Sequence, residues 1–103
     1  MTRKTRISEL PDFDMAESLQ SEEDVALYLS LVLEDGDAAE FTHALGVVAR
    51  VRGMSAVAER SGLTRESLYK ALRPSSQPRF DTIHRVCQAL GVRLVALPLV
   101  TPH

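Results

Sequence analysis

The side chains best suited to chemistry lie on one short predicted helix, between Thr64 and Leu72. At about 100° per residue, Leu68 turns inward while the opposite side carries charged and hydrogen-bonding groups. A helix fits the major groove of B-DNA, where arginine can bond guanine through two hydrogen bonds and glutamate can accept from cytosine. We therefore predict DNA contacts on this helix (Arg65, Glu66, Ser67, Tyr69, Lys70) and around it (Ser55, Thr64, Arg73, Ser75, Gln77, Arg79).

Two groups of these assignments have an alternative that the sequence leaves open. Glu66 and Lys70 are four residues apart in the favourable order for a surface ion pair. The polar side chains that follow the helix are also typical of a solvated loop. Phosphate contacts from that loop and from the ends of helices would supply affinity and fix the register on DNA.

A tight helical pair is needed to position this helix. The stretch MSAVAERSGLTRESLYKALR, residues 54–73, places a small residue at Ala58, a glycine at Gly62 and an aliphatic residue at Leu68. This spacing is typical of a helix-turn-helix, in which the small residue lies at the helix contact and the glycine reverses the backbone. The alternative is any two packed helices.

Five helices are predicted in all, each with a residue at its start that can cap it. Apolar residues at helical spacing, such as Val25, Tyr28, Leu29 and Val32, mark the inner faces. The predicted helices and caps are 21–35 after Ser21, 37–52 after Asp37 with Glu40 in capping-box register, 55–61 after Ser55, 64–72 after Thr64, and 81–90 after Asp81. We assign Cys87, on the inner face of the last helix, to the core.

The tail VRLVALPLV differs from the helices because it is rich in β-forming residues and apolar on both alternating faces. We predict a strand over residues 92–99 that pairs with its copy across a two-fold axis, with Pro98 either ending the ladder or lying on its edge. The predicted dimer interface comprises Val92, Leu94, Val95, Ala96, Leu97 and Leu99.

Charge divides the chain into two parts. Residues 8–40 contain eleven acidic residues and no lysine or arginine, whereas residues 41–103 contain nine basic residues and three acidic ones. A short basic start, residues 1–7, precedes them. The division predicts an acidic and a basic partner surface on one small protein, unless the two parts simply attract each other.

Composition argues against several other classes of protein. The start of the chain has no apolar leader and no stretch approaches the roughly 18 apolar residues of a membrane span, so we expect a soluble cytoplasmic protein. One cysteine gives no disulfide and no thiolate cluster, and we expect no metal or cofactor. His43, His84 and His103 are scattered, with no serine or cysteine in a known catalytic pattern, so an enzyme is not expected.

Three segments in order resemble the small addiction-module antidote proteins, antitoxins with a Cro-like, XRE-type helix-turn-helix. They are SEEDVALYLSLVLEDGDAAEF, GMSAVAERSGLTRESLYKAL and FDTIHRVCQALGVRLVALP, and the similarity extends from Asp12 to about Pro98. It implies a mainly α, five-helix Cro/repressor-like domain over residues 21–103, preceded by a polar lead at 1–20. The chain departs from the pattern at Met54, where many such domains have a glutamine that touches phosphate; we assign that contact to Ser55.

The resemblance also implies two partners. One is a RelE/ParE-like toxin encoded beside the chain, and the other is the shared operator, which a dimer of the antitoxin represses. Toxins of that class are basic, so complementary carboxylates are expected at Glu22, Glu23, Asp24, Glu34, Asp35 and Asp37. For each carboxylate the alternative is helix capping or solvation. The alternative for the whole chain is an XRE-type repressor without a toxin partner.

Overall fold

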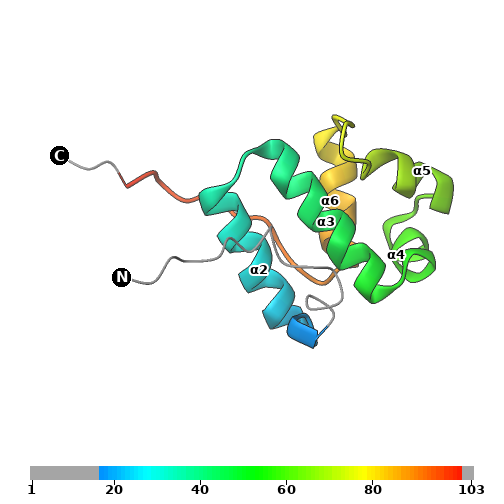
Figure 1. The fold of residues 1–103 in the computed structure, drawn as a ribbon, viewed down its shortest axis with the longest axis horizontal. Coiled ribbons are helices and arrows are strands. Elements are labelled where there is room, and N and C mark those ends of the chain that lie inside the picture. The colour runs from blue at the N-terminus through cyan, green and yellow to red at the C-terminus, as the bar shows by residue number, and fades with distance from the viewer. Residues whose placement is uncertain (1–16, 101–103) are drawn as a thin grey trace.

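The computed structural model describes residues 17–100, and the helices between residues 22 and 89 follow the predicted order (Figure 1). They are α2 (Glu22–Asp35), α3 (Ala38–Arg52), α4 (Met54–Ser61), α5 (Arg65–Ala71) and α6 (Phe80–Ala89). The mainly α prediction is therefore confirmed. Of the polar lead at 1–20, only residues 17–20 are described, and Leu19 among them is buried in the core.

The first two helices begin where their capping residues predict. Ser21 Oγ accepts a hydrogen bond from the Asp24 amide at 3.1 Å, and the Asp24 carboxylate accepts one from the Ser21 amide at 3.2 Å. This reciprocal pair is a capping box, which satisfies two backbone donors that the helix leaves open. At α3, the Asp37 carboxylate accepts from the Glu40 amide at 2.9 Å. Hydrogen bonds to nearby side chains thus fix the first residues of α2 and α3.

Two predicted caps are wrong. Ser55 is exposed within the first turn of α4, because Gly53 (φ 102°) ends α3 and the next helix begins directly at Met54. Asp81 lies within α6, whose N-cap is Arg79 in an extended conformation. The Asp81 carboxylate is instead 3.4 Å from Nε of Arg85, one turn further on. Neither α4 nor α6 has a side-chain cap hydrogen bond.

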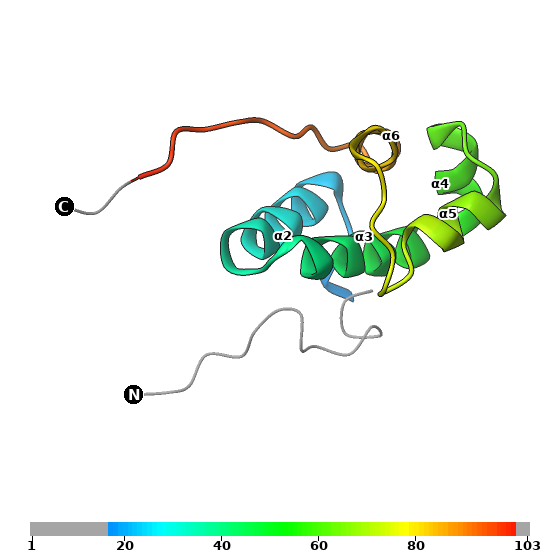
Figure 2. The same ribbon diagram turned by 90° about the horizontal axis from the view of Figure 1, so that it is seen from above.

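The core lies where the helices converge on α3 and α4. Helix α3 contacts α2 and α4, and α4 also contacts α5 and α6. The largest fully buried side chains come from all of these helices except α4: Val25, Leu45, Val48, Leu68, Val86 and Cys87. Helices α2 and α5 lie at opposite ends of this helical body, as two views agree (Figures 1 and 2).

The C-terminal tail has no regular secondary structure in the single chain. Val92 and Leu94 pack against the core, but Val95, Leu97 and Leu99 are largely exposed, and the tail runs away from the helices (Figure 2). Strand hydrogen bonds need a second strand, and residues 17–100 contain none. The predicted strand over 92–99 is therefore absent from the isolated chain, and its pairing across a dimer stays a prediction.

A search of the described helices for a membrane span finds no candidate that is both long and apolar enough.

The core position of Cys87 gives a chemical test of the fold. Its side chain is 1 % exposed, and burial raises the pKa of the thiol to about 11. Because the thiolate is the nucleophile, we expect the native protein at pH 8 to react with a disulfide reagent only as fast as the core opens. The chain has one cysteine, so the unfolded protein should react at once with one equivalent. Equal rates for native and urea-unfolded protein would contradict this packing.

Candidate nucleic-acid interface

A tight turn over residues 62–64 joins α4 to α5. Gly62 adopts the left-handed conformation (φ 76°), and the Leu63 amide bonds back to the Ala58 carbonyl at 3.0 Å. The same carbonyl accepts from Ser61 Oγ, also at 3.0 Å. Ala58 is buried where the helices meet, as its small size predicts, and Leu68 is 0 % exposed. The turn thus sets α5 across α4 with the opposite side of α5 in solvent.

Two hydroxyl groups fix the start of α5. Thr64 Oγ1 accepts from the Ser67 amide at 3.0 Å, which confirms Thr64 as the cap, and it donates to Ser67 Oγ at 3.0 Å. Since Ser67 Oγ accepts this bond, its own hydrogen remains available for an acceptor outside the protein. The N-terminal end of α5 therefore carries a positioned hydroxyl donor.

Arg65 and Tyr69 act as a pair, which sequence reasoning did not anticipate. Arg65 Nη2 donates to Tyr69 Oη at 3.2 Å, and the guanidinium carbon lies 5.5 Å from the centroid of the tyrosine ring. This distance is within the range of a cation–π contact. The i, i+4 spacing was the available signal, because such residues are neighbours on a helix surface. Restraint of the guanidinium reduces the entropy that a base contact would cost.

Glu66 and Lys70 do not form the surface pair that their spacing allows. Both side chains are exposed, and no ion pair joins them within the part of the chain that the structure describes. Their charged ends are therefore presented to solvent from the side of α5 opposite Leu68.

The remaining predicted phosphate contacts lie in two places. Ser55 is exposed on α4, and the other four are exposed after α5: Arg73, Ser75, Gln77 and Arg79. The loop that holds them is tied to α5, since the Ser76 amide donates to the Arg73 carbonyl at 3.0 Å and Ser76 Oγ donates to the Ala71 carbonyl. The exposed positive charge of Arg73 thus adjoins the end of the helix.

The acidic residues predicted to meet a toxin separate into two groups. Asp24 and Asp37 are helix caps, and the Asp24 carboxylate also accepts from the Gln20 amide at 3.0 Å. The other four are exposed on α2, Glu22 and Glu23 in its first turn and Glu34 and Asp35 in its last. Capping therefore accounts for two of the six, while four remain on the surface of α2.

Two exposed leucines lie among these carboxylates, and sequence reasoning missed them. Leu27 is 62 % exposed and Leu31, one turn later, is 38 % exposed. At about 100° per residue, both lie on the outer face of α2, with Glu23 and Glu34 along one side and Asp35 along the other. The sequence signal was an apolar residue at nearly every position from Val25 to Leu33. An apolar centre with a charged rim is the usual anatomy of a protein interface.

The two histidines among residues 17–100 lie on different helices. His43 is half-buried on α3, His84 is exposed on α6 with its ring 5.9 Å from that of Phe80, and His103 lies outside the described residues. Residues 17–100 contain no group of three or more histidine, cysteine or acidic side chains that could hold a metal ion.

Comparison with known proteins identifies a family that matches most of the chain. A family model described as probable addiction module antidote protein matches residues 9–98, which include all of α2–α6. An uncharacterised protein of Haemophilus influenzae is 44 % identical over 85 residues, a stretch that covers 82 % of this chain and 88 % of that relative. No solved structure matches the chain.

The left-handed turn can be tested by substitution at Gly62. We predict that Gly62→Ala lowers the free energy of unfolding by about 1–2 kcal/mol, because a β-carbon disfavours this conformation. No steric clash adds to this cost, since the nearest atom to an added β-carbon is Arg85 Nη1 at 4.0 Å. Urea unfolding measures the change. Gly62→Asn is the control, and its loss should be smaller because asparagine tolerates this region; equal losses would argue against the turn.

Proposed function

The chain belongs to the family of probable addiction module antidote proteins, and we propose that it is the antitoxin of a type II toxin–antitoxin module. It binds a basic RelE/ParE-like toxin directly, and as a homodimer it represses the shared operon in the cytoplasm by sequence-specific DNA binding. The observation that carries this proposal is that two helices lie at opposite ends of one small domain (Figure 1): α2, which has exposed carboxylates and leucines, and α5, which has exposed basic and hydrogen-bonding side chains.

The DNA-binding part of the proposal rests on how α5 is held. Leu68 is the buried residue of this helix, so the side that carries Glu66 and Lys70 points outward, and Arg65 is exposed in the first turn. In the proposed complex, α5 enters the major groove and the Arg65–Tyr69 pair presents the remaining guanidinium donors to a guanine. Arg73 and the loop after it contact phosphates, and Ser55 does so from α4.

The toxin-binding part rests on the outer face of α2. Leu27 and Leu31 supply an apolar anchor that becomes buried on binding, where most of the binding energy arises. Glu23, Glu34 and Asp35 attract a basic partner during approach and align it. The homodimer contributes its tails, residues 92–99, to the interface between the copies.

Co-expression with the adjacent reading frame tests the proposal directly. A tag on one of the two proteins should purify both, and the complex should bind the DNA upstream of the pair. An adjacent product that does not co-purify, together with operator binding by this chain alone, would support the repressor without a toxin.

Substitutions of two arginines should have different effects on DNA binding. Arg65→Ala should weaken operator binding by about 1–3 kcal/mol and reduce specificity, since it removes a base contact. Arg73→Ala should weaken specific and non-specific binding alike and reduce the salt dependence, since it removes a phosphate contact. Gel-shift titrations on operator and unrelated DNA at several salt concentrations measure both. If Arg65→Ala left the ratio of operator binding to non-specific binding unchanged, the base contact assigned to Arg65 would be contradicted.

Charge reversal on α2 should separate the two activities. Glu34→Lys combined with Asp35→Lys should impair toxin neutralisation, mainly through slower association, and the defect should be largest at low salt. Operator binding should persist because α5 lies at the other end of the molecule. A growth-rescue assay with the toxin and a gel shift measure the two effects. Full rescue with lost DNA binding would mean that the acidic segment braces the basic part of its own chain.

A further inference from the structure

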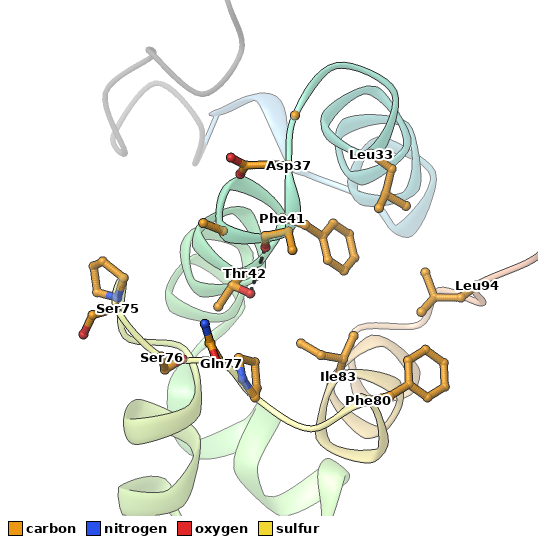
Figure 3. A pocket seen from close by; sticks show the side chains of 15 residues that line it. Leu33, Asp37, Phe41, Thr42, Ser75, Ser76, Gln77, Phe80, Ile83 and Leu94 are labelled. Atoms are coloured by element: carbon orange, nitrogen blue, oxygen red, sulfur yellow. Dashed lines mark hydrogen bonds between the residues drawn. The ribbon is translucent and has the colours of Figure 1, made fainter.

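A mostly apolar groove of about 770 Å³ opens between the end of α2, the start of α3, the loop after α5 and the start of α6 (Figure 3). Its apolar lining includes Leu33, Phe41, Phe80, Ile83 and Leu94. Leu33 and Phe80 are 51 % and 70 % exposed, which is unusual for large apolar side chains that adjoin a cavity. The single chain therefore leaves an apolar surface uncovered here.

The C-terminal tail begins at this groove and then leaves it. Leu94 lines the groove, whereas Val95, Leu97, Leu99 and Val100 are between 66 % and 94 % exposed along a segment that points away from the body (Figures 1 and 2). Residues 94–100 carry no charge, so they match neither a DNA backbone nor a basic protein surface. The chain thus has two uncovered apolar surfaces that adjoin each other.

The tail is poorly suited to fill the groove of its own chain. To do so it would have to reverse direction directly after Leu94, but no glycine follows Gly91. Pro98 fixes its own φ and favours an extended conformation at Leu97, and Val95 is β-branched. The segment is therefore built to continue outward.

We propose that the groove receives the tail of a second copy of this chain, and that two copies exchange residues 95–100 reciprocally. The same groove and the same tail are used on both sides, as two-fold symmetry requires. This inference rests on the homodimer of the proposed function and names the surface that each tail contacts. It replaces pairing of the two tails with each other as the main contact.

The surface area that the exchange would bury is comparable with that of a stable dimer interface. Burial of a valine or leucine side chain removes about 100 Å² of apolar surface from water. With four such side chains in each tail, and an equal area of groove covered by each, the exchange buries about 1,600 Å² in total, the size of a standard specific interface. Contacts of residues 92–94 with their own core keep the start of the tail in place.

Sedimentation equilibrium of the full-length chain tests the exchange with two kinds of variant. The tail variant carries Leu97→Asp and Leu99→Asp, and the groove variant carries Leu33→Asp and Phe80→Asp. All four positions are at least half exposed, so folding should persist, as circular dichroism can verify. We expect each variant to raise the dimer dissociation constant at least tenfold. Leu27→Asp, an exposed leucine on α2 outside the groove, is the matched control and should leave it unchanged.

Mixing the two variants distinguishes this exchange from other dimers. The tail variant has an intact groove and the groove variant an intact tail, so an equal mixture should regain heterodimers held by one seated tail. A dimer that resists the groove substitutions but not the tail substitutions would overturn the inference and leave the homodimer standing, with the tails paired to each other. A wild-type chain that stays monomeric would overturn the inference and the homodimer together, without affecting DNA or toxin binding by single copies.

Discussion

The orientation of the candidate DNA surface depends on the packing of Leu68 into the core. Helix α5 has seven residues, too few to be stable alone in water, and Leu68 is the residue within it that the core encloses. Fixing this side chain against the rest of the core fixes the rotation of α5, and with it the outward direction of Glu66 and Lys70. The left-handed turn at Gly62 sets the angle at which the helix arrives. Packing inside the domain thereby determines what the domain presents outside.

Much of this arrangement could be predicted because it is encoded locally. Ser21, Asp37 and Thr64 each bond a backbone amide three residues on, so a capping residue followed by apolar residues at helical spacing was sufficient to place α2, α3 and α5. Gly62 was recognisable for the same reason, since the turn requires a conformation that glycine adopts without strain. The inward and outward faces of α5 followed from its periodicity alone.

What sequence reasoning missed depends on details that residue type and spacing do not specify. Ser55 and Asp81 are plausible caps by residue type, but Gly53 joins α3 directly to α4, and Arg79 starts α6 without a side-chain bond. The Arg65–Tyr69 contact depends on two rotamers, which the pattern does not specify. The spacing of apolar residues correctly marked the buried face of α2, but Leu27 and Leu31 lie outside that face, and a pattern that identifies the inner side does not show that apolar side chains are also left exposed. The tail was predicted to be a strand from its composition, but composition does not reveal whether a partner strand exists.

The groove is lined both by the end of α2 and by the loop that follows α5, so it adjoins both candidate surfaces. Leu33, on one wall, directly precedes Glu34 and Asp35, while Ser75 and Gln77, on another, belong to the loop that follows α5 (Figure 3). A tail seated there would contact the end of the acidic helix and the loop of the DNA-binding part together. In the proposed dimer, the seated tail would then contact the loop that carries the proposed phosphate contacts and set the spacing of the two copies of α5, which would have to match two half-sites on DNA. Since α2 and α5 lie at opposite ends of the helical body, a toxin bound to α2 and an operator bound to α5 would contact separate surfaces, and any coupling between them through the seated tails would be reciprocal.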